Sequence, residues 1–582
     1  MKYPKIPLAQ TVVQLCKAKN IQHIVLSPGS RNAPLTIGFT YDSFFKCYSI
    51  VDERCAAFFA LGIAQQIQEP VAVVCTSGSA LLNYYPAVAE AFYSNIPLVV
   101  LSADRPKYLV GIGDGQTINQ EEVFKNHILY SANLKQDLGE ENKLEANNLP
   151  IIKSIENKLE KYLGFQKTIQ EHNDKELNIA FNISISKKGP VHVNVPFNEP
   201  LYDTVDTLNV NPKVIPLGKK ELLNEDLKPF VNLWNTTKCK LVLVGSNLPN
   251  SVEQQYLDVL AEDESVLILT ETISNIHHDR FIPGIDKLIA ALNSKELEQL
   301  KPEILVTFGG FVVSKKIKIF LREYKPKHHW HISEHDANDT FFVLNKVFKL
   351  PINTFFEEFL KQIILVKSDY NNFWLDAFKS RREKHKDYMK TLSFSDFKVF
   401  DVLLKAIPRH SQLQVGNSSA IRYTQLFDLD TTLEVFCNRG TSGIDGSTST
   451  AIGAAIVSPL QTTFLTGDLS FLYDSNALWN NYIPNNFRIV VVNNGGGGIF
   501  RILPGHKNTP NFDAFFETKH NLTAKHLCEM YGLDYCIATN EKELSNVLDN
   551  FYTIGRKPKL LEVFTPGSEN DEILLNYFAK IK

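Results

Sequence analysis

Short runs of apolar, often β-branched residues alternate along the chain with segments whose apolar residues recur at helical spacing. The apolar runs are typical of strands buried on both faces, and the periodic segments are typical of helices that pack on a sheet. In the first 200 residues, strands are predicted at 23–26, 46–51, 71–75, 97–102 and 189–197, and helices at 33–40, 53–67 and 80–93. This alternation predicts a doubly wound sheet of parallel strands.

The same alternation occurs in two later regions. Strands are predicted at 240–246, 265–270 and 303–310 in the second region, and at 412–419, 432–436, 462–468 and 488–494 in the third. A charged, helix-prone insertion is predicted at 131–175, a polar linker at 202–226 and a charged helix near 370–390. Because 582 residues are too many for one core, we predict an α/β protein with three doubly wound parallel-sheet domains, at 1–200, 201–365 and 366–582.

The composition is that of an ordinary globular protein, with 44% apolar and 21% charged residues. The formal net charge of −3 gives no reason to expect nucleic acid or an anionic membrane as a partner. No stretch approaches the roughly 18 apolar residues of a membrane helix, and MKYPKIPLAQ lacks the apolar core of a signal peptide. The eight cysteines are scattered without a C-x-x-C pair, which favours a reducing compartment, so we expect a cytoplasmic protein.

Two polar motifs each close a predicted strand of the third region. They are T-G-D-L-S at 466–470 and N-N-G-G at 493–496, the second of which opens a run of four glycines. Asp468 and Asn494 are 26 residues apart, the length of one strand–helix–strand unit, which brings both side chains to one edge of a sheet. Oxygen ligands of this kind suit Mg²⁺, and glycine amides can surround a diphosphate. The alternative for each motif alone is an unrelated turn.

This spacing resembles the diphosphate and metal motif of thiamine-diphosphate enzymes. The resemblance implies that Mg²⁺ or Mn²⁺ is bound by Asp468, the side chain of Asn494 and the carbonyl of Gly496, with Leu469 and Ser470 also at the cofactor. It further implies a glutamate that shares a proton with N1′ of the aminopyrimidine, and such a glutamate needs a dry site and a raised pKa. Glu53 fits, at a strand–helix junction before an apolar helix. The alternative is an ordinary acidic residue at a helix start, stabilised by the dipole or paired with Arg54.

Longer segments narrow the resemblance to the 2-succinyl-5-enolpyruvyl-6-hydroxy-3-cyclohexene-1-carboxylate (SEPHCHC) synthase family, thiamine-diphosphate-dependent transferases of menaquinone biosynthesis. The segments are SPGSRNAPLT (27–36), TSGSALLNYYPAVAEAFYSNIPLVVLSADRP (76–106), VGNSSAIR (415–422), NRGTSGIDGSTSTA (438–451) and GDLSFLYDSNAL (467–478). Acetolactate synthases and decarboxylases are similar in the metal motif but do not have SPGSRNAPLT or NRGTSGIDG. The family's three-domain order accounts for the whole chain.

The resemblance implies that the enzyme joins 2-oxoglutarate to isochorismate with loss of CO₂. Both substrates are dicarboxylates, and the planar fork of arginine binds carboxylates at two points. Carried over by motif, the substrate residues are Ser30, Arg31, Arg105, Gln116, Lys315, Ser418, Arg422 and Arg439. Ile444 resembles the apolar wedge that bends the cofactor, and Ile499 and Phe500 resemble apolar walls beside the reacting carbon. The alternative for any single arginine is a solvated surface cation.

One loop departs from the family pattern. Asp114 and Gly115 precede Gln116, where the family has Ala and Asn, so a negative charge stands near a site for anions. The resemblance also implies a homodimer or homotetramer whose active sites are shared, with Glu53 and Asp468 of each site from different chains.

Three other functions are compatible with parts of the sequence. The first is an acetolactate-type enzyme acting on pyruvate, which would not need several arginines. The second is a non-catalytic dinucleotide-binding protein, although no G-x-G-x-x-G follows the first strand. The third is a zinc site at His328, His329, His331 and His335, which lacks cysteine ligands and is the least favoured.

Overall fold

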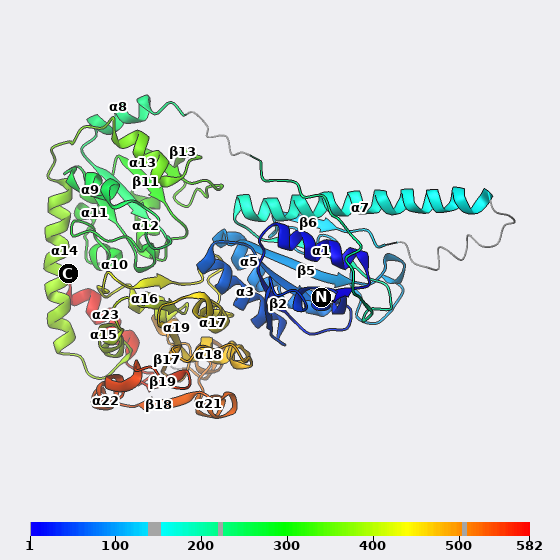
Figure 1. Cartoon of the computed structure of the whole chain (residues 1–582). Helices are drawn as coiled ribbons and strands as arrows, with labels where there is room; N and C mark the ends of the chain where they lie inside the picture. The colour runs from blue at the N-terminus through cyan, green and yellow to red at the C-terminus, as the bar shows by residue number, and fades with distance from the viewer. Residues whose placement is uncertain (1, 138–152, 219–224, 503–508) are drawn as a thin grey trace. The chain divides into compact units, whose positions relative to one another are not determined.

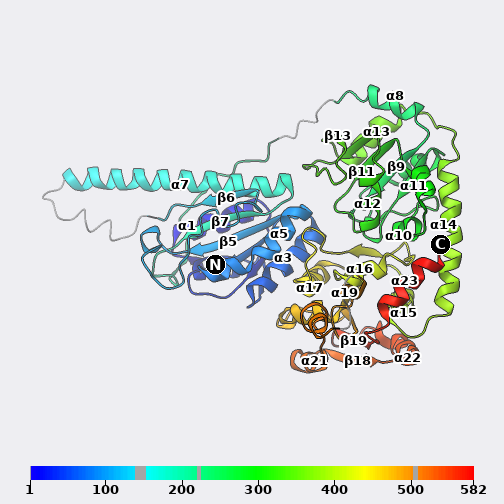
Figure 2. The same ribbon diagram turned by 180° about the vertical axis from the view of Figure 1, so that it is seen from behind.

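The computed structural model describes residues 2–137, 153–218, 225–502 and 509–582. Its main sheets contain six, five and six strands, and every strand pair within them is parallel, which confirms the predicted α/β class. Figures 1 and 2 show them in blue to cyan, in green, and in yellow to red. The chain forms two compact units. Unit 1 comprises Met1–Lys219, Gly440–Pro459 and Asp474–Pro484, and unit 2 comprises Lys220–Arg439, Leu460–Tyr473 and Asn485–Lys582.

The six-stranded sheet of unit 1 has the order β3-β2-β4-β5-β7-β6. Its strands are β2 (His23–Leu26), β3 (Lys46–Ser49), β4 (Val71–Cys75), β5 (Leu98–Asp104), β6 (Tyr130–Asn133) and β7 (Val191–Pro196). The chain leaves β2 first toward β3 and then crosses back to β4, so the strand order reverses between β2 and β4. Ligands of open parallel sheets bind beyond the carboxyl ends of the strands at such a reversal.

Two helices of unit 1 have the predicted bounds, α2 (Ala33–Thr40) and α3 (Glu53–Ile67). The predicted single helix at 80–93 is wrong, because the structure has α4 (Ser79–Asn83) followed by α5 (Tyr85–Ser94). Pro86 lies in the first turn of α5, where a proline is tolerated; inside a continuous helix it would remove a hydrogen bond. The remaining regular elements among the described residues of unit 1, outside α7 and α17, are β1 (Tyr3–Pro4), α1 (Pro7–Ala18), η1 (Lys107–Leu109), β8 (Thr204–Val205) and η4 (Ser475–Leu478).

The predicted insertion at 131–175 is only partly helical. Its first residues belong to β6, which pairs with β7, and helix α7 runs from Lys153 to Lys187, beyond the predicted end. Residues 138–152 of the insertion lie outside the described residues, as do residues 219–224 of the predicted linker. Within the linker, β8 pairs antiparallel with β1.

Unit 2 contains the other two sheets. The five-stranded sheet has the order β10-β9-β11-β12-β13, and the six-stranded sheet has the order β15-β14-β16-β17-β19-β18. The strands are β9 (Lys240–Val244), β10 (Val266–Leu269), β11 (Ile304–Phe308), β12 (His328–Ile332), β13 (Leu344–Phe348), β14 (Gln412–Val415), β15 (Glu434–Phe436), β16 (Thr462–Gly467), β17 (Arg488–Asn493), β18 (Asp534–Ala538) and β19 (Lys559–Phe564).

Helices cover both sheets of unit 2. Those beside the five-stranded sheet are α8 (Lys228–Thr236), α9 (Gln254–Glu262), α10 (Ile285–Ile289), α11 (Ser294–Leu300), α12 (Lys315–Glu323) and α13 (Ile352–Leu360). Those of the six-stranded sheet include α15 (Asp396–Ala406), α16 (Ser419–Thr424), α18 (Asp468–Tyr473), α19 (Ile499–Ile502), α21 (Lys525–Tyr531), α22 (Glu541–Phe551) and α23 (Asn570–Lys580). No helix among the described residues combines the length and the apolar content that a membrane crossing requires.

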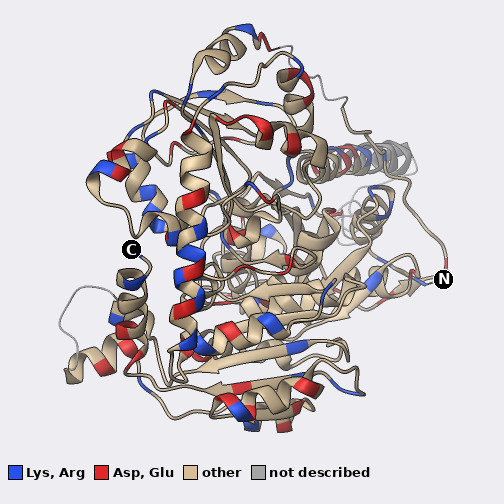
Figure 3. Ribbon diagram, turned by 90° about the vertical axis from the view of Figure 1, so that its left-hand side faces the viewer, with Lys and Arg blue, Asp and Glu red and all other residues tan. Residues whose placement is uncertain are grey.

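Helix α14 (Tyr370–Lys390) is the charged helix predicted near 370–390. Lysines, arginines and acidic residues lie along it (Figure 3), and three of its Lys–acid pairs are spaced by three residues. The side chains of Trp374 and Phe378 are buried in the core of the five-stranded sheet. The helix therefore presents one apolar stripe inward and a charged face to water.

Helix α17 (Ser447–Val457) lies in sequence between β15 and β16 of the six-stranded sheet of unit 2 but packs on α3 in unit 1. The two helices approach very closely at Gly62 and Gly453. A Cβ atom added to Gly62 would lie 2.0 Å from the carbonyl oxygen of Thr450, and one added to Gly453 would lie 2.0 Å from that of Phe59. Because these partners are backbone atoms, side-chain movement cannot make room, and the crossing requires glycine at both positions.

We therefore expect Gly453→Ala to lower the thermal unfolding midpoint, at a cost of about 1–3 kcal/mol from overpacking. The matched control is Gly38→Ala in α2, where the added Cβ would lie 2.7 Å from a side-chain methyl of Val13, which can shift. Differential scanning calorimetry checks both variants. An unchanged midpoint for Gly453→Ala would contradict the close helix crossing.

Candidate active site

Glu53 is the first residue of α3, directly after the turn that follows β3. The Asp52 carboxylate caps the helix by accepting from the Cys55 amide at 3.1 Å. Glu53 is half-buried. Burial, and after it the charge of Glu53, raises the pKa of the Cys75 thiol at the end of β4 well above its usual value. The glutamate therefore lies close to a fully buried part of the sheet edge, as a proton-sharing residue requires.

Asp474 holds the start of α3 against the start of α17. Its completely buried carboxylate accepts from the Ser449 amide at 2.7 Å, from the Ser449 hydroxyl at 3.1 Å and from the Cys55 thiol at 3.6 Å. Arg54 lies 3.8 Å from the same carboxylate. Burial raises the pKa of Asp474 to about 6, and the hydrogen bonds and the Arg54 charge oppose this shift. Arg54 thus forms an ion pair with Asp474.

Ile444 is in the loop that leads into α17, two residues before the helix N-cap Gly446. The loop belongs to unit 1 and is anchored by the buried carboxylate of Glu90, which accepts from the amides of Gly440 and Thr441 at 2.7 Å each. Because α17 packs on α3, the structure brings the loop of Ile444 and the start of the Glu53 helix into one unit.

Arg31 lies in the loop between β2 and α2 and is only 5% exposed. Its guanidinium donates to the carbonyl of Phe197 at 3.2 Å and to the Glu199 carboxylate at 3.3 Å. Its Nε has no hydrogen-bond partner among the described residues. Burial, followed by the nearby charge of Arg105, lowers the pKa of Arg31, and Glu199 opposes the shift. The neighbouring Ser30 is exposed.

Arg105 follows β5 and meets the loop that departs from the family pattern. Its Nε donates to the carbonyl of Gly115 at 2.9 Å and lies 3.3 Å from the Asp114 carboxylate. The extra acidic residue is therefore paired with an arginine of the same site. Gln116 is exposed and has a left-handed backbone with φ +54°.

The motif of Asp468 lies at the carboxyl ends of β16 and β17 in unit 2. Asp468 is 4% exposed, and one of its oxygens accepts from the amides of Gly495 at 2.9 Å and Gly496 at 3.0 Å. The other oxygen accepts from the Leu469 amide at 2.7 Å, and His520 Nε2 lies 3.3 Å from the carboxylate. Gly495 has φ +77° and Gly496 has φ +155°, conformations that other residues rarely adopt. The glycine run thus folds over the aspartate.

Asn494 is oriented by a second acidic residue. Its Nδ2 donates at 2.8 Å to Asp396, the first residue of α15. Burial raises the pKa of Asp396 to about 6, and hydrogen bonds from Thr565 and Asn494 oppose the shift. Since the amide nitrogen is used on Asp396, the amide oxygen is the atom of Asn494 that suits a metal ion.

A buried ion pair anchors the far side of the glycine run. Arg501 and Glu517 are 5% and 3% exposed, and Arg501 donates to both carboxylate oxygens of Glu517 through Nε and Nη2. The backbone carbonyl of Glu517 accepts from the Gly497 amide at 2.6 Å. The pair therefore fixes the loop that carries the apolar residues Ile499, which is half-buried, and Phe500, which is 38% exposed.

Arg439 follows β15, and Arg422 lies in α16, which follows β14, so both come after the carboxyl ends of neighbouring strands of the same six-stranded sheet. Arg439 donates from Nη1 to Asn417 Oδ1 at 2.6 Å, and the Asn417 amide donates to the carbonyl of Asn438 at 2.7 Å. Burial, and then the charge of Arg439, lowers the pKa of Arg422 on α16, with Asp286 opposing. Ser418 precedes α16 in a left-handed conformation with φ +66°.

The other predicted residues have less distinctive surroundings. Lys315 is the first residue of α12 and is exposed, Leu469 is half-buried, and Ser470 is buried in α18. His329 and His331 lie in β12 and both meet the Thr307 hydroxyl, at 2.9 and 2.8 Å. Burial lowers the pKa of each to about 4. In the described residues, no three histidine, cysteine or acidic side chains form a group that could hold a metal ion.

The structure gathers the predicted residues into two sets. Glu53, Arg31, Arg105 and Ile444 belong to unit 1, and Asp468, Asn494, Arg422 and Arg439 belong to unit 2. In each set the side chains follow the carboxyl ends of parallel strands or lie in the loops and helices just beyond them.

Comparison with known proteins decides the family. Residues 6–127 match the family model described as "Thiamine pyrophosphate enzyme, N-terminal TPP binding domain". The 2-succinyl-5-enolpyruvyl-6-hydroxy-3-cyclohexene-1-carboxylate synthases of Flavobacterium psychrophilum and Christiangramia forsetii are 55% and 56% identical to the chain, over all of both sequences. The chain belongs to the SEPHCHC synthase family. The synthase of Porphyromonas gingivalis is 35% identical over 98% of the chain and 96% of its own length.

Sequence reasoning missed several residues that build this SEPHCHC synthase-type site. Asp474, Asn417 and Glu90 lie inside the quoted motifs, yet a motif does not reveal which partner a polar side chain contacts. Arg501 directly follows Phe500, and Glu517 lies in no motif. The only signal for Arg501 in the sequence is a charged residue next to the predicted apolar wall. A charged residue on the protein surface would give the same signal.

The residues present fit a hard divalent cation bound to a diphosphate. Asp468 would supply a carboxylate, Asn494 its amide oxygen and Gly496 a carbonyl in a glycine-rich turn, which are the oxygen ligands that such a cation prefers.

We expect Arg501→Met to weaken the joint binding of thiamine diphosphate and Mg²⁺ by at least about tenfold. Removing one partner of a buried pair costs about 3–5 kcal/mol, because it leaves the Glu517 carboxylate with only the half-exposed Lys519, 3.6 Å away, and the glycine loop depends on Glu517. Isothermal titration calorimetry measures the affinity. Lys525→Met, which removes an exposed cation of α21, is the control, and equal affinities in the two variants would contradict this role of the ion pair.

Proposed function

We propose that this protein is a SEPHCHC synthase, a thiamine-diphosphate-dependent transferase that joins 2-oxoglutarate to isochorismate with loss of CO₂ in menaquinone biosynthesis. The full-length identity of 55% to a synthase of this name supports the activity. The sequence motifs of both units support it as well, because they extend beyond the cofactor segments.

The observation that carries the proposal is the presence of two arginine pairs. Burial, followed by the charge of the neighbouring Arg105, lowers the pKa of Arg31 in unit 1, and burial, followed by the charge of Arg439, lowers the pKa of Arg422 in unit 2. Like charges held together and partly buried are unfavourable unless an anion neutralises them. Two dicarboxylate substrates without a phosphate group are suitable anions for such pairs.

When bound, thiamine diphosphate supplies the carbon nucleophile that joins the two substrates. Glu53 shares its carboxyl proton with the aminopyrimidine end, and Asp474 holds the helix that carries Glu53. Asp468, Asn494 and Gly496 hold Mg²⁺ or Mn²⁺ at the diphosphate end, with Leu469 and Ser470 beside them. Ile444 would be the apolar wedge that bends the cofactor, and Ile499 and Phe500 would exclude water from the reacting groups.

Serine, glutamine and lysine complete the proposed substrate contacts. Ser30, Gln116 and Ser418 provide hydrogen-bonding groups next to the arginines, and Lys315 provides a further cation at the start of α12. Ser30, Gln116 and Lys315 are exposed, and Ser418 is half-buried.

We further propose a homodimer or homotetramer that shares its active sites, in the cytoplasm, with domains at 1–200, 201–365 and 366–582. All eight cysteines are free thiols, which supports a reducing compartment. A mass of one chain in sedimentation equilibrium would contradict the assembly.

Product analysis tests the proposed activity. The protein is incubated with thiamine diphosphate, Mg²⁺, 2-oxoglutarate and isochorismate, and mass spectrometry is expected to find SEPHCHC together with equimolar CO₂. Acetolactate from pyruvate, with no SEPHCHC from the two dicarboxylates, would instead support an acetolactate-type enzyme.

We expect Glu53→Gln to reduce kcat by at least about 100-fold, since a positioned acid or base contributes roughly that much. The amide keeps the size of the side chain but cannot share an acidic proton. Circular dichroism and the unfolding midpoint are expected to remain those of the unmodified protein. Full turnover in this variant would refute the proton-sharing role.

We expect Arg31→Ala and Arg439→Ala each to raise KM for a dicarboxylate by about tenfold or more, with little change in cofactor affinity, because charge-assisted hydrogen bonds contribute about 1.5–3 kcal/mol. Arg409→Ala, which removes a largely exposed arginine paired with Asp430, is the control. Steady-state kinetics and cofactor titration measure the two quantities. A fall in cofactor affinity with unchanged KM would contradict the assignment.

A further inference from the structure

Asn275 joins the two sheets of unit 2 through its side-chain amide. It follows the short helix η3 (Thr272–Ser274), which comes after β10. The backbone amide of Val435 in β15 donates to Asn275 Oδ1 at 2.8 Å, and Asn275 Nδ2 donates to the carbonyl of Val435 at 2.9 Å. The side chain thus forms with Val435 the pair of hydrogen bonds that a neighbouring strand would form.

This pairing matters because β15 is the edge strand of the six-stranded sheet. It pairs with β14 on one side, and the order of the sheet places no further strand on the other. Asn275 therefore takes the place of a missing strand at one residue pair. An edge strand has unpaired backbone groups, and its position depends on whatever covers them.

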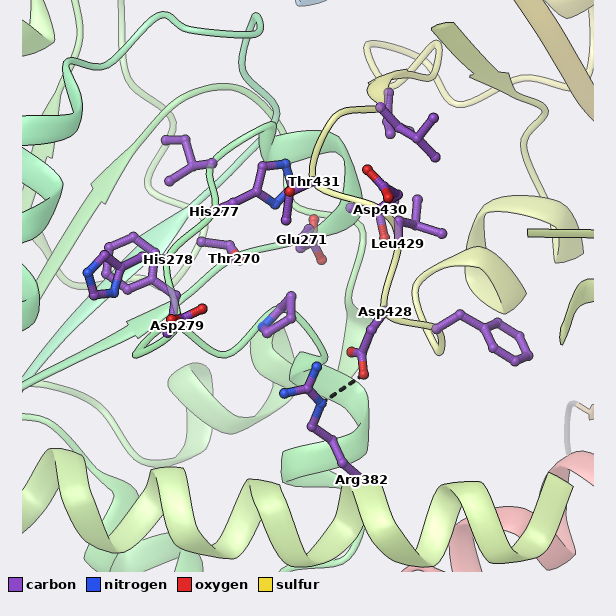
Figure 4. A pocket seen from close by; sticks show the side chains of 17 residues that line it. Thr270, Glu271, His277, His278, Asp279, Arg382, Asp428, Leu429, Asp430 and Thr431 are labelled. Carbon is purple, nitrogen blue, oxygen red and sulfur yellow. Dashed lines mark hydrogen bonds and ion pairs between the residues drawn. The ribbon is translucent and has the colours of Figure 1, made fainter. Parts of the chain in front are cut away.

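A cavity of about 370 Å³ lies beside the same joint (Figure 4). It is lined by Glu271 and Ile276 from the central region and by Asp430, Leu433 and Val435 from the segment that contains β15. Figure 4 shows Asp430 and Leu429 on one side and His277 and Glu271 on the other, with Arg382 paired to Asp428 below them. The side chains of Leu433 and Val435 are buried in the core of the six-stranded sheet, and the two hydrogen bonds of Asn275 hold the backbone of Val435 on the side of the cavity.

The platform that presents Asn275 is rigid. Asn275 Nδ2 also donates to the carbonyl of Asn247 at 2.8 Å, and the Asn247 amide donates to the carbonyl of Ile273 at 3.0 Å. The buried Glu271 carboxylate accepts from the amides of Val313 and Ser314 at 2.7 Å each, immediately before α12. Asn275 itself has a left-handed backbone with φ +50°, a conformation that asparagine tolerates well.

The strand that Asn275 fixes leads directly to Arg439. β15 ends at Phe436, and Arg439 follows three residues later, where Asn417 accepts from its guanidinium at 2.6 Å. Asn417 orients the end of the arginine side chain, whereas Asn275 fixes the backbone from which that side chain starts. A shift of about 1 Å at a binding group can cost up to about 100-fold in rate.

We propose that Asn275 is a positioning residue for substrate binding, which acts by holding β15 so that Arg439 meets a substrate carboxylate. The proposal rests on the substrate role of Arg439 given above. Asn275 itself touches neither substrate nor cofactor in this account.

The test is a double-mutant cycle of Asn275→Gly and Arg439→Ala. Glycine retains the left-handed backbone and removes only the amide. Asn275→Gly is expected to raise KM for the dicarboxylate bound by Arg439 about tenfold, the equivalent of losing two hydrogen bonds, with cofactor affinity within about twofold. In the Arg439→Ala background the same change is expected to raise KM by less than about twofold, because the group it positions is gone.

Asn250→Gly is the matched control, since Asn250 is exposed and has φ +56°. It is expected to leave KM unchanged. Asn275→Asp keeps the acceptor for the Val435 amide but turns an oxygen instead of a donor toward the carbonyls of Asn247 and Val435, so a rise in KM of at least the same size is expected, and this variant serves if the glycine variant does not fold.

Each other outcome is decisive. Fully additive effects on KM, or unchanged KM in both Asn275 variants, would overturn the positioning role while leaving the function of Arg439 intact. Unchanged KM in Arg439→Ala alone would overturn the substrate role of Arg439, and this inference with it.

Discussion

The buried carboxylate of Asp468 is the constraint around which the proposed cofactor end is built. A carboxylate that is 4% exposed is stable only if hydrogen bonds replace its lost water. The amides of Leu469, Gly495 and Gly496 supply them, and the last two can reach the carboxylate only because glycine allows their positive φ angles. The conformation of the glycine run is thus dictated by one charge, and the loop beyond it is then fixed by Arg501 and Glu517.

Acidic and basic groups are balanced in the same way at the proposed substrate end. Asp114 stands where the family has alanine, yet its carboxylate lies 3.3 Å from Arg105, so it orients an arginine. Glu199 does the same for Arg31, and Asn417 does so for Arg439 without a charge. These partners keep each guanidinium in place for the proposed binding of a substrate carboxylate.

Local patterns predicted most strands of the three main sheets but missed β6, β12, β13, β18 and β19. The bounds of α2 and α3 were predicted correctly, because an apolar helical period between two apolar strands leaves little choice. The helix break at Pro86 was visible in the sequence and was overlooked. Strand β6 was missed because its residues, Tyr130–Asn133, have no strand pattern of their own and form a strand only by pairing with the buried β7.

The residues of the candidate site could be predicted from the sequence, but most of their hydrogen-bond and ion-pair partners could not. Motifs identified Asp468, Asn494 and the arginines, since their chemistry is tied to their spacing. The contacts that orient them come from residues far away in sequence, such as Asp396 for Asn494 and Asp474 for the helix of Glu53. The need for glycine at positions 62 and 453 could not be predicted from local sequence either, because it arises only where α3 and α17 cross.

The most direct measurement is anomalous diffraction from crystals grown with thiamine diphosphate and Mn²⁺. The account predicts one strong manganese peak within about 2.5 Å of Asp468, the Asn494 amide oxygen and the Gly496 carbonyl; a bound coenzyme with its metal ion away from these three groups would contradict it.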